Sequence, residues 1–112
     1  MNEARARQAL LARLGEIAQE DRISEEGRAP VRLAQDSVGR LSRMDAMQQQ
    51  AMAQAQERRR IQEKSRIAAA LARMDEGEWG FCIQCGDSIA PKRLVHDPSV
   101  AVCFECASAE GD

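Results

Sequence analysis

Apolar residues at helical spacing predict two long helices in the first two thirds of the chain. The first covers residues 3–26, where apolar side chains recur every three to four positions and so share one helix face. Its stripe consists of Leu10, Leu11, Leu14, Ile17 and Ala18. Gly27 and Pro30 predict its end, because glycine suits a C-terminal cap and proline cannot continue a helix.

The second helix is predicted to begin between residues 37 and 43 and to run to about residue 76, where Gly77 is the expected stop. The stretch 31–41 is ambiguous, since Gly39 interrupts its apolar residues. The predicted seam of this helix consists of Met44, Met47, Ala51, Ile61, Ala68, Leu71 and Met74. Packing in this seam is the simplest explanation for the methionines.

Two such helices are marginal alone in water, so we expect them to bury their stripes against each other. At ~1.5 Å per residue they would be about 35 and 50 Å long. The predicted fold is therefore mainly α: an antiparallel helical hairpin over 1–76, with its tip near 27–41, and a separate module over 77–112.

Composition and charge limit the function. The three aromatic residues all lie in the last third, and no apolar stretch approaches membrane-spanning length. The N-terminus also lacks the apolar run of a secretion signal, so we expect the chain to be cytoplasmic. Residues 1–74 hold 14 Lys+Arg and 10 Asp+Glu, whereas residues 75–112 hold 2 and 8. The acidic C-terminal part would repel a phosphate backbone, which argues against direct DNA binding.

Four cysteines carry the clearest chemistry, in the pattern Cys82-x2-Cys85-x17-Cys103-x2-Cys106. Each pair can form a tight knuckle, and two knuckles supply four thiolates to one tetrahedral Zn²⁺. Gly86 stands where the first knuckle must turn. A module of 36 residues with three aromatic side chains cannot fold on a hydrophobic core alone, so we expect one structural zinc to supply much of its folding energy. The segment from Cys103 to Glu110 is a candidate short helix.

Other interpretations of these residues remain open. Four thiolates could also hold an iron–sulfur cluster. A dithiol redox site fits two matched pairs poorly, and a catalytic zinc would need a free coordination position. His96 is expected to be a surface or packing residue, and the Arg58–Arg60 run to be a solvated face. Trp79, Phe81 and Phe104 are expected to pack around the knuckles.

The C-terminal motifs resemble the four-cysteine finger of the DksA/TraR family of bacterial transcription factors. The matching segments are Gly80-Phe81-Cys82-Ile83-Gln84-Cys85-Gly86, Lys92-Arg93-Leu94 and Val102-Cys103-Phe104-Glu105-Cys106. The resemblance implies a coiled coil that enters the secondary channel of RNA polymerase without binding DNA, with acidic residues at its tip. It also implies an effect on promoter complexes, often together with ppGpp, whose role here the sequence leaves open.

The expected tip departs from the family pattern Asp-x-x-Asp-x-Ala. After Asp36 the chain reads Ser-Val-Gly-Arg-Leu, so Gly39 and Leu41 replace the second aspartate and the alanine. Asp45, followed by Ala46, is a second candidate without the family spacing. Asp36 and Asp45 are therefore the candidate partner-binding residues.

The leading hypothesis is a zinc-binding regulator of RNA polymerase. A zinc ribbon that binds nucleic acid and a helical adaptor are the alternatives. We expect no enzyme, because no cluster of His, Asp or Ser suggests catalysis.

Overall fold

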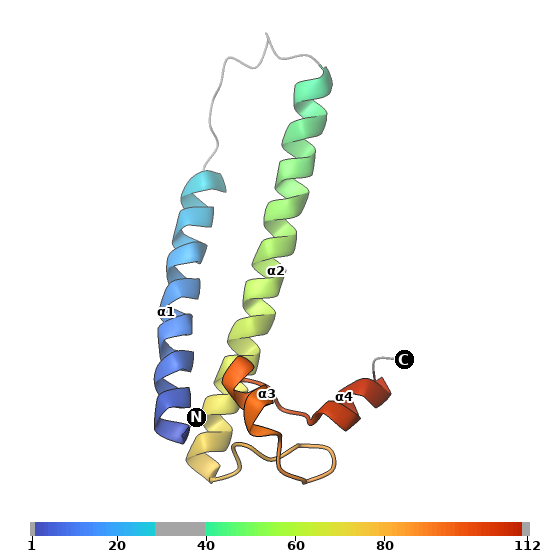
Figure 1. The fold of residues 1–112 in the computed structure, drawn as a ribbon. Helices are drawn as coiled ribbons and strands as arrows, with labels where there is room; N and C mark the ends of the chain where they lie inside the picture. The colour runs from blue at the N-terminus through green and yellow to red at the C-terminus, as the bar shows by residue number, and fades with distance from the viewer. Residues whose placement is uncertain (1, 29–39, 111–112) are drawn as a thin grey trace.

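The computed structural model describes residues 2–28 and 40–110. Its elements are α1 (Glu3–Arg28), α2 (Arg40–Glu76), α3 (Pro91–His96) and α4 (Phe104–Glu110). α1 and α2 run antiparallel along each other, and the short helices α3 and α4 lie at the end where α2 stops (Figure 1). The predicted fold class, a mainly α hairpin followed by a small finger, is confirmed.

The ends of α1 differ slightly from the prediction. Its start is capped by Asn2, whose side-chain oxygen accepts a hydrogen bond of 2.8 Å from the backbone N–H of Arg5. The helix continues through Gly27 to Arg28, two residues past the predicted end at 26. A single glycine costs only about 1 kcal/mol in a helix and need not end one. The predicted tip at 27–41 lies mostly outside the described residues, and Asp36 lies wholly outside them.

The apolar seam of the hairpin lies near the finger. Ile17 and Ile67 are its largest fully buried side chains. The other buried members are Ala6, Leu10, Ala70 and Met74, and Leu14, Leu71 and Trp79 pack against the cluster at its edge. Burial of this cluster provides the hydrophobic attraction between α1 and α2.

The predicted seam of α2 is wrong at five of its seven residues. Met44, Met47 and Ile61 are 61%, 68% and 56% exposed, and Ala51 and Ala68 are exposed as well. An ion pair between Asp21 and Arg60 sets the register, so α1, which ends at Arg28, reaches only about residue 53 of α2. Met44 and Met47 therefore lie beyond the end of α1. On α1, the predicted stripe residues Leu11 and Ala18 are likewise exposed.

Polar residues continue the seam where the apolar cluster stops. The side chain of Arg60 is only 11% exposed, and its Nε donates to Asp21 at 2.6 Å. Lys64 donates to the same carboxylate at 2.8 Å. Arg58 and Arg59 are exposed. The expectation of a solvated arginine run therefore holds for Arg58 and Arg59 and is wrong for Arg60, which the helical turn directs toward α1.

A second, smaller cluster lies within the finger. Cys82, Ile89 and Leu94 are buried there, with Val100 and Val102 packed beside them. Trp79 contacts this cluster and the hairpin cluster, and its Nε1 donates to the Pro98 carbonyl at 2.9 Å. Trp79 thus joins the two parts of the chain.

The remaining finger features were predicted incompletely. Phe81 and Phe104 are 48% and 70% exposed, so the expectation that all three aromatic residues pack around the knuckles is wrong for these two. α3 was not predicted, although a proline at the first helical position, Pro91, is a known start signal. Among the described helices, none carries an apolar stretch long enough to cross a membrane.

Candidate metal centre

The first cysteine pair lies in a tight turn between α2 and α3. The backbone N–H of Cys82 donates to Asp87 at 2.8 Å, and the N–H of Gly86 donates back to the Cys82 carbonyl at 3.0 Å. Gly86 has φ +81°, a conformation that L side chains rarely adopt, as the predicted sharp turn requires. An isolated bridge between Phe81 and Ser88 closes the loop, which directs Cys82 and Cys85 to one side.

The second pair lies at the start of α4. Cys103 directly precedes the helix, and Cys106 is in its first turn. The predicted short C-terminal helix is therefore confirmed, beginning one residue later than predicted. A backbone hydrogen bond of 2.9 Å from Ile83 to Ala101 joins the two knuckles and brings the pairs together.

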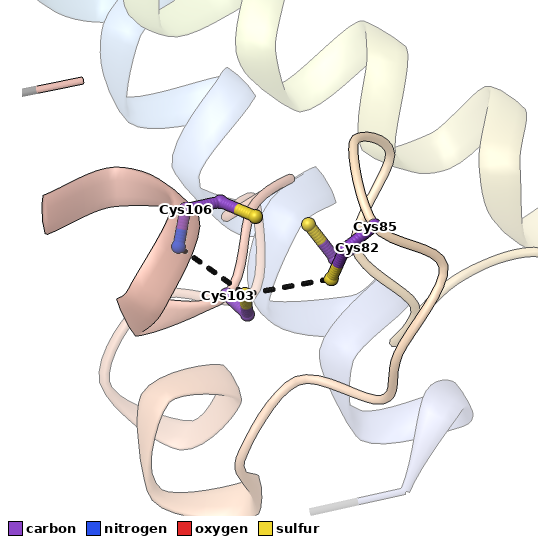
Figure 2. A group of neighbouring side chains, drawn as sticks. All are labelled: Cys82, Cys85, Cys103 and Cys106. Carbon is purple, nitrogen blue, oxygen red and sulfur yellow. Dashed lines mark hydrogen bonds between the residues drawn. The ribbon is translucent and has the colours of Figure 1, made fainter. Parts of the chain in front are cut away.

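The four sulfurs converge on one point (Figure 2). All four lie within 4.8 Å of one another, and the Cys85 and Cys103 sulfurs are 3.7 Å apart. A tetrahedral zinc with Zn–S distances of about 2.3 Å needs sulfurs about 3.8 Å apart. The two sulfurs of a disulfide lie about 2.05 Å apart, and all four cysteines here are free. The donor set therefore has the size and chemistry of a closed zinc site with four thiolate ligands.

Backbone N–H groups point at the sulfurs, as thiolate ligands require. Gln84 donates to the Cys82 sulfur and Cys106 to the Cys103 sulfur, each at 3.4 Å. Hydrogen bonds from backbone N–H groups, that of Cys85 foremost, lower the pKa of Cys82 to about 6. Hydrogen bonding with the Cys103 and Cys82 side chains raises the pKa of Cys106. One cysteine thus ionises readily, while a bound cation must displace protons from others in the cluster.

The finger has little else to hold it together. Cys82 is buried, Cys103 and Cys106 are partly buried, and Cys85 is exposed. Only Ile89 and Leu94 are buried apolar residues in the same cluster apart from the cysteine itself. A core of this size does not fold a module alone, so metal binding supplies much of the folding free energy. The four-sulfur geometry agrees with the predicted single structural Zn²⁺.

The other candidate residues lie apart from this cluster. Asp45 is exposed on α2, and at ~1.5 Å per residue it lies about 45 Å along the helix from Glu76. His96 is exposed in the last turn of α3 and contributes no donor to the four-sulfur cluster.

Two arginines donate hydrogen bonds to the backbone just before Cys103, a role that is not evident from the sequence. The Nε of Arg93 donates to the Val102 carbonyl at 3.0 Å and so fixes the segment that leads into Cys103. Arg73 of α2 reaches the Val100 carbonyl at 3.5 Å. In the sequence Arg93 stands out only as part of the basic pair before Leu94, and nothing there signals the role of Arg73.

Comparison with known proteins agrees with this geometry. The family described as prokaryotic dksA/traR C4-type zinc finger matches residues 77–110. No curated protein sequence matches the chain. The structure of transcription factor DksA2 from Pseudomonas aeruginosa is similar with a TM-score of 0.62 and 25% identity, over 96% of this chain and 76% of that chain.

The two comparisons cover different parts of the molecule. The family match covers the finger that holds the four sulfurs, whereas the structural match extends over the hairpin as well. Zinc-site geometry, finger sequence and overall architecture thus agree: residues 77–110 form a zinc finger of the dksA/traR C4 type, in a chain whose fold is similar to that of DksA2.

Proposed function

We propose that this DksA-like transcription factor regulates RNA polymerase by placing its helical hairpin in the secondary channel of the enzyme, without sequence-specific DNA binding. The observation that carries the proposal is the likeness to a transcription factor over 96% of this chain, which includes the hairpin and not the finger alone. An isolated zinc finger of this family would not require a hairpin of matching length and position.

In this proposal the two parts of the chain have separate tasks. Cys82, Cys85, Cys103 and Cys106 hold one Zn²⁺, and the module over 77–112 forms a rigid base. The hairpin over 1–76 presents the tip near 27–41. Asp36 within the tip and Asp45, just after it on α2, are the candidate acidic contacts. No catalytic step is needed, and the compartment is the cytoplasm, where the polymerase of a bacterium works.

Charge supports a protein partner over nucleic acid. Residues 75–112 hold 2 Lys+Arg against 8 Asp+Glu, so phosphate would be repelled at this end. A zinc ribbon that binds nucleic acid would need the opposite balance.

A photo-crosslinking amino acid at position 36 or 45 tests the proposal with zinc-loaded protein, purified RNA polymerase and low salt. We expect crosslinks to polymerase from these positions and none from position 11, since Leu11 is exposed on α1 in the part nearest the finger. Absence of a crosslink from both distal positions, together with failure of the protein to co-purify with polymerase, contradicts the proposal.

A further inference from the structure

The side of α2 turned away from α1 carries a second regular stripe. Positions that recur every three or four residues share a helix face, because an α-helix has about 3.6 residues per turn. Arg60, Ile67, Ala70 and Met74 form the face toward α1. A second face, offset from the first around the helix axis, consists of Met44, Met47, Ala51, Ala55, Arg58, Gln62, Arg66, Ala69 and Arg73, and we call it the outer stripe.

The outer stripe is open to solvent over most of its length. Met44 and Met47 are 61% and 68% exposed, and Arg58 and Arg66 are exposed too. The distal end of α2 extends past α1 in Figure 1, with no other described segment beside it. Because α1 does not reach this part of α2, the exposed methionine and alanine side chains form an apolar surface with no partner among the described residues.

Charge on this face has one sign. The outer stripe contains arginine at positions 58, 66 and 73 and no aspartate or glutamate. Arg58 and Arg66 form no hydrogen bond or ion pair with any residue that the structure describes. These guanidinium groups therefore differ from Arg13 and Arg60, which are engaged by carboxylates across the hairpin.

The finger covers only one end of the stripe. Arg73 donates to the Val100 carbonyl, and Arg66, Ala69 and Arg73 line a groove together with the segment 99–102. The outer stripe thus begins at the finger and continues uncovered toward the distal end. From Met44 to Arg66 it is about 33 Å long at ~1.5 Å per residue, which is enough for an extended contact.

We propose that the outer stripe of α2 is the surface that holds the hairpin against its protein partner, and that the partner surface is apolar opposite the methionines and acidic opposite Arg58 and Arg66. The inference rests on the proposed function, because the partner is taken to be RNA polymerase. Methionine suits such a contact, since its unbranched and polarisable side chain adapts to the shape it meets. Arginine adds charge complementarity to acidic side chains.

A protein surface fits this stripe better than nucleic acid does. Its distal half, from Met44 to Ala55, offers no cation on the stripe itself, whereas a phosphate backbone would require cations at regular intervals. The aromatic residues that could stack on bases all lie in the finger.

The test measures binding of fluorescently labelled, zinc-loaded full-length protein to purified RNA polymerase free of nucleic acid. The double variant R58E/R66E is expected to weaken binding by about tenfold or more at low salt, because it sets like charges against an acidic surface. R58K/R66K should retain most of the affinity. M44Q/M47Q, which keeps helix-forming residues, should weaken binding without changing its dependence on salt.

The matched control is R5E/R22E, which makes the same charge change at exposed positions of α1. Equal loss of affinity in R5E/R22E and R58E/R66E overturns the assignment of the outer stripe, since the effect would then be one of net charge. Unchanged binding by R58E/R66E and M44Q/M47Q, with the unaltered protein binding well, also overturns the stripe and leaves the proposed function standing. Failure of the unaltered protein to bind polymerase refutes the proposed function itself.

A second experiment measures binding of the same variant to nucleic acid and so distinguishes a phosphate contact from a protein contact. If R58E/R66E binds polymerase normally and loses affinity only for promoter DNA or RNA, the stripe contacts phosphate and the proposal is wrong. Helical circular dichroism and zinc content, measured for each variant, show that the fold is retained.

Discussion

Arg13 and Glu63 form a two-pronged ion pair across the hairpin: Nε and one terminal nitrogen of Arg13 donate to the two carboxylate oxygens of Glu63 at 2.7 and 2.9 Å. Arg13 also bonds Glu16 and Glu20 of its own helix. The pair lies beside the apolar cluster of Ile17 and Ile67, where a slip of one residue would separate the charges. It therefore favours one register of α1 against α2.

We expect the Arg13–Glu63 pair to show a measurable coupling energy. R13M and E63Q should each destabilise the protein by roughly 1 kcal/mol, as for a partly exposed bidentate pair. The double variant should lose less than the sum of the two. Denaturant unfolding of the four proteins gives the coupling, and R5M is the control because Arg5 is exposed on α1. Strict additivity would mean that the pair adds nothing to the hairpin.

Burial predicts opposite outcomes for two isoleucines of the same helix. Ile67 is 1% exposed within the seam, whereas Ile61 is 56% exposed. I67A should cost about 2–4 kcal/mol through lost burial and the cavity left behind, and I61A should stay within about 0.5 kcal/mol. Thermal or denaturant unfolding measures both. A large loss in I61A would show that this side chain is covered in solution.

Acid should weaken the hairpin through Asp21 and Glu63. Hydrogen bonds from Lys64 and Arg60 lower the pKa of Asp21, and that from Arg13 lowers the pKa of Glu63. The unfolded chain then binds protons at a higher pH than the folded one. The stabilisation is complete above the ordinary carboxyl pKa values of 3.8 and 4.5, and it is lost as the pH falls through the folded values.

The measurement compares melting temperatures between pH 7 and pH 2 in the unaltered protein and in D21N/E63Q. We expect the difference in melting temperature between the two proteins to shrink below about pH 4.5. Loss of zinc in acid affects both proteins and so cancels in the difference. A constant difference across this range would contradict the assigned pKa directions.

Removing zinc should unfold the finger and leave most of the helix. α3 and α4 contain 6 and 7 residues, whereas α1 and α2 contain 26 and 37, so a chelator should remove only a small part of the helical signal. Trp79 is the only tryptophan and packs against both clusters. Its emission should therefore shift to the red.

C85S should reproduce the effect of the chelator and lower the bound zinc below one per chain, whereas S88A should not. An unchanged Trp79 emission in metal-free protein would show that the finger keeps its packing without the ion. Zinc affinity should also fall as the pH is lowered, because protons compete for the thiolates.

The sequence by itself determined the features that depend on local chemistry. Cysteine pairs with two intervening residues and Gly86 at positive φ determine the knuckles, because a turn of that length leaves few other conformations. The long helices follow likewise from their helix-forming residues, and α2 begins at Arg40, within the predicted range of 37 to 43. These signals act within a few residues and can be recognised without knowing what packs against them.

Only the tertiary structure decided which face of α2 meets α1. The pattern placed Met44, Met47 and Ile61 in the seam, and yet the positions that face α1 are Arg60, Ile67 and Ala70. In a sequence where alanine, methionine and arginine occur on every side, several faces have similar hydrophobicity. The choice among them depends on the length of α1 and on ion pairs between residues some 40 to 50 positions apart. Such pairs exist only once the chain has folded back on itself.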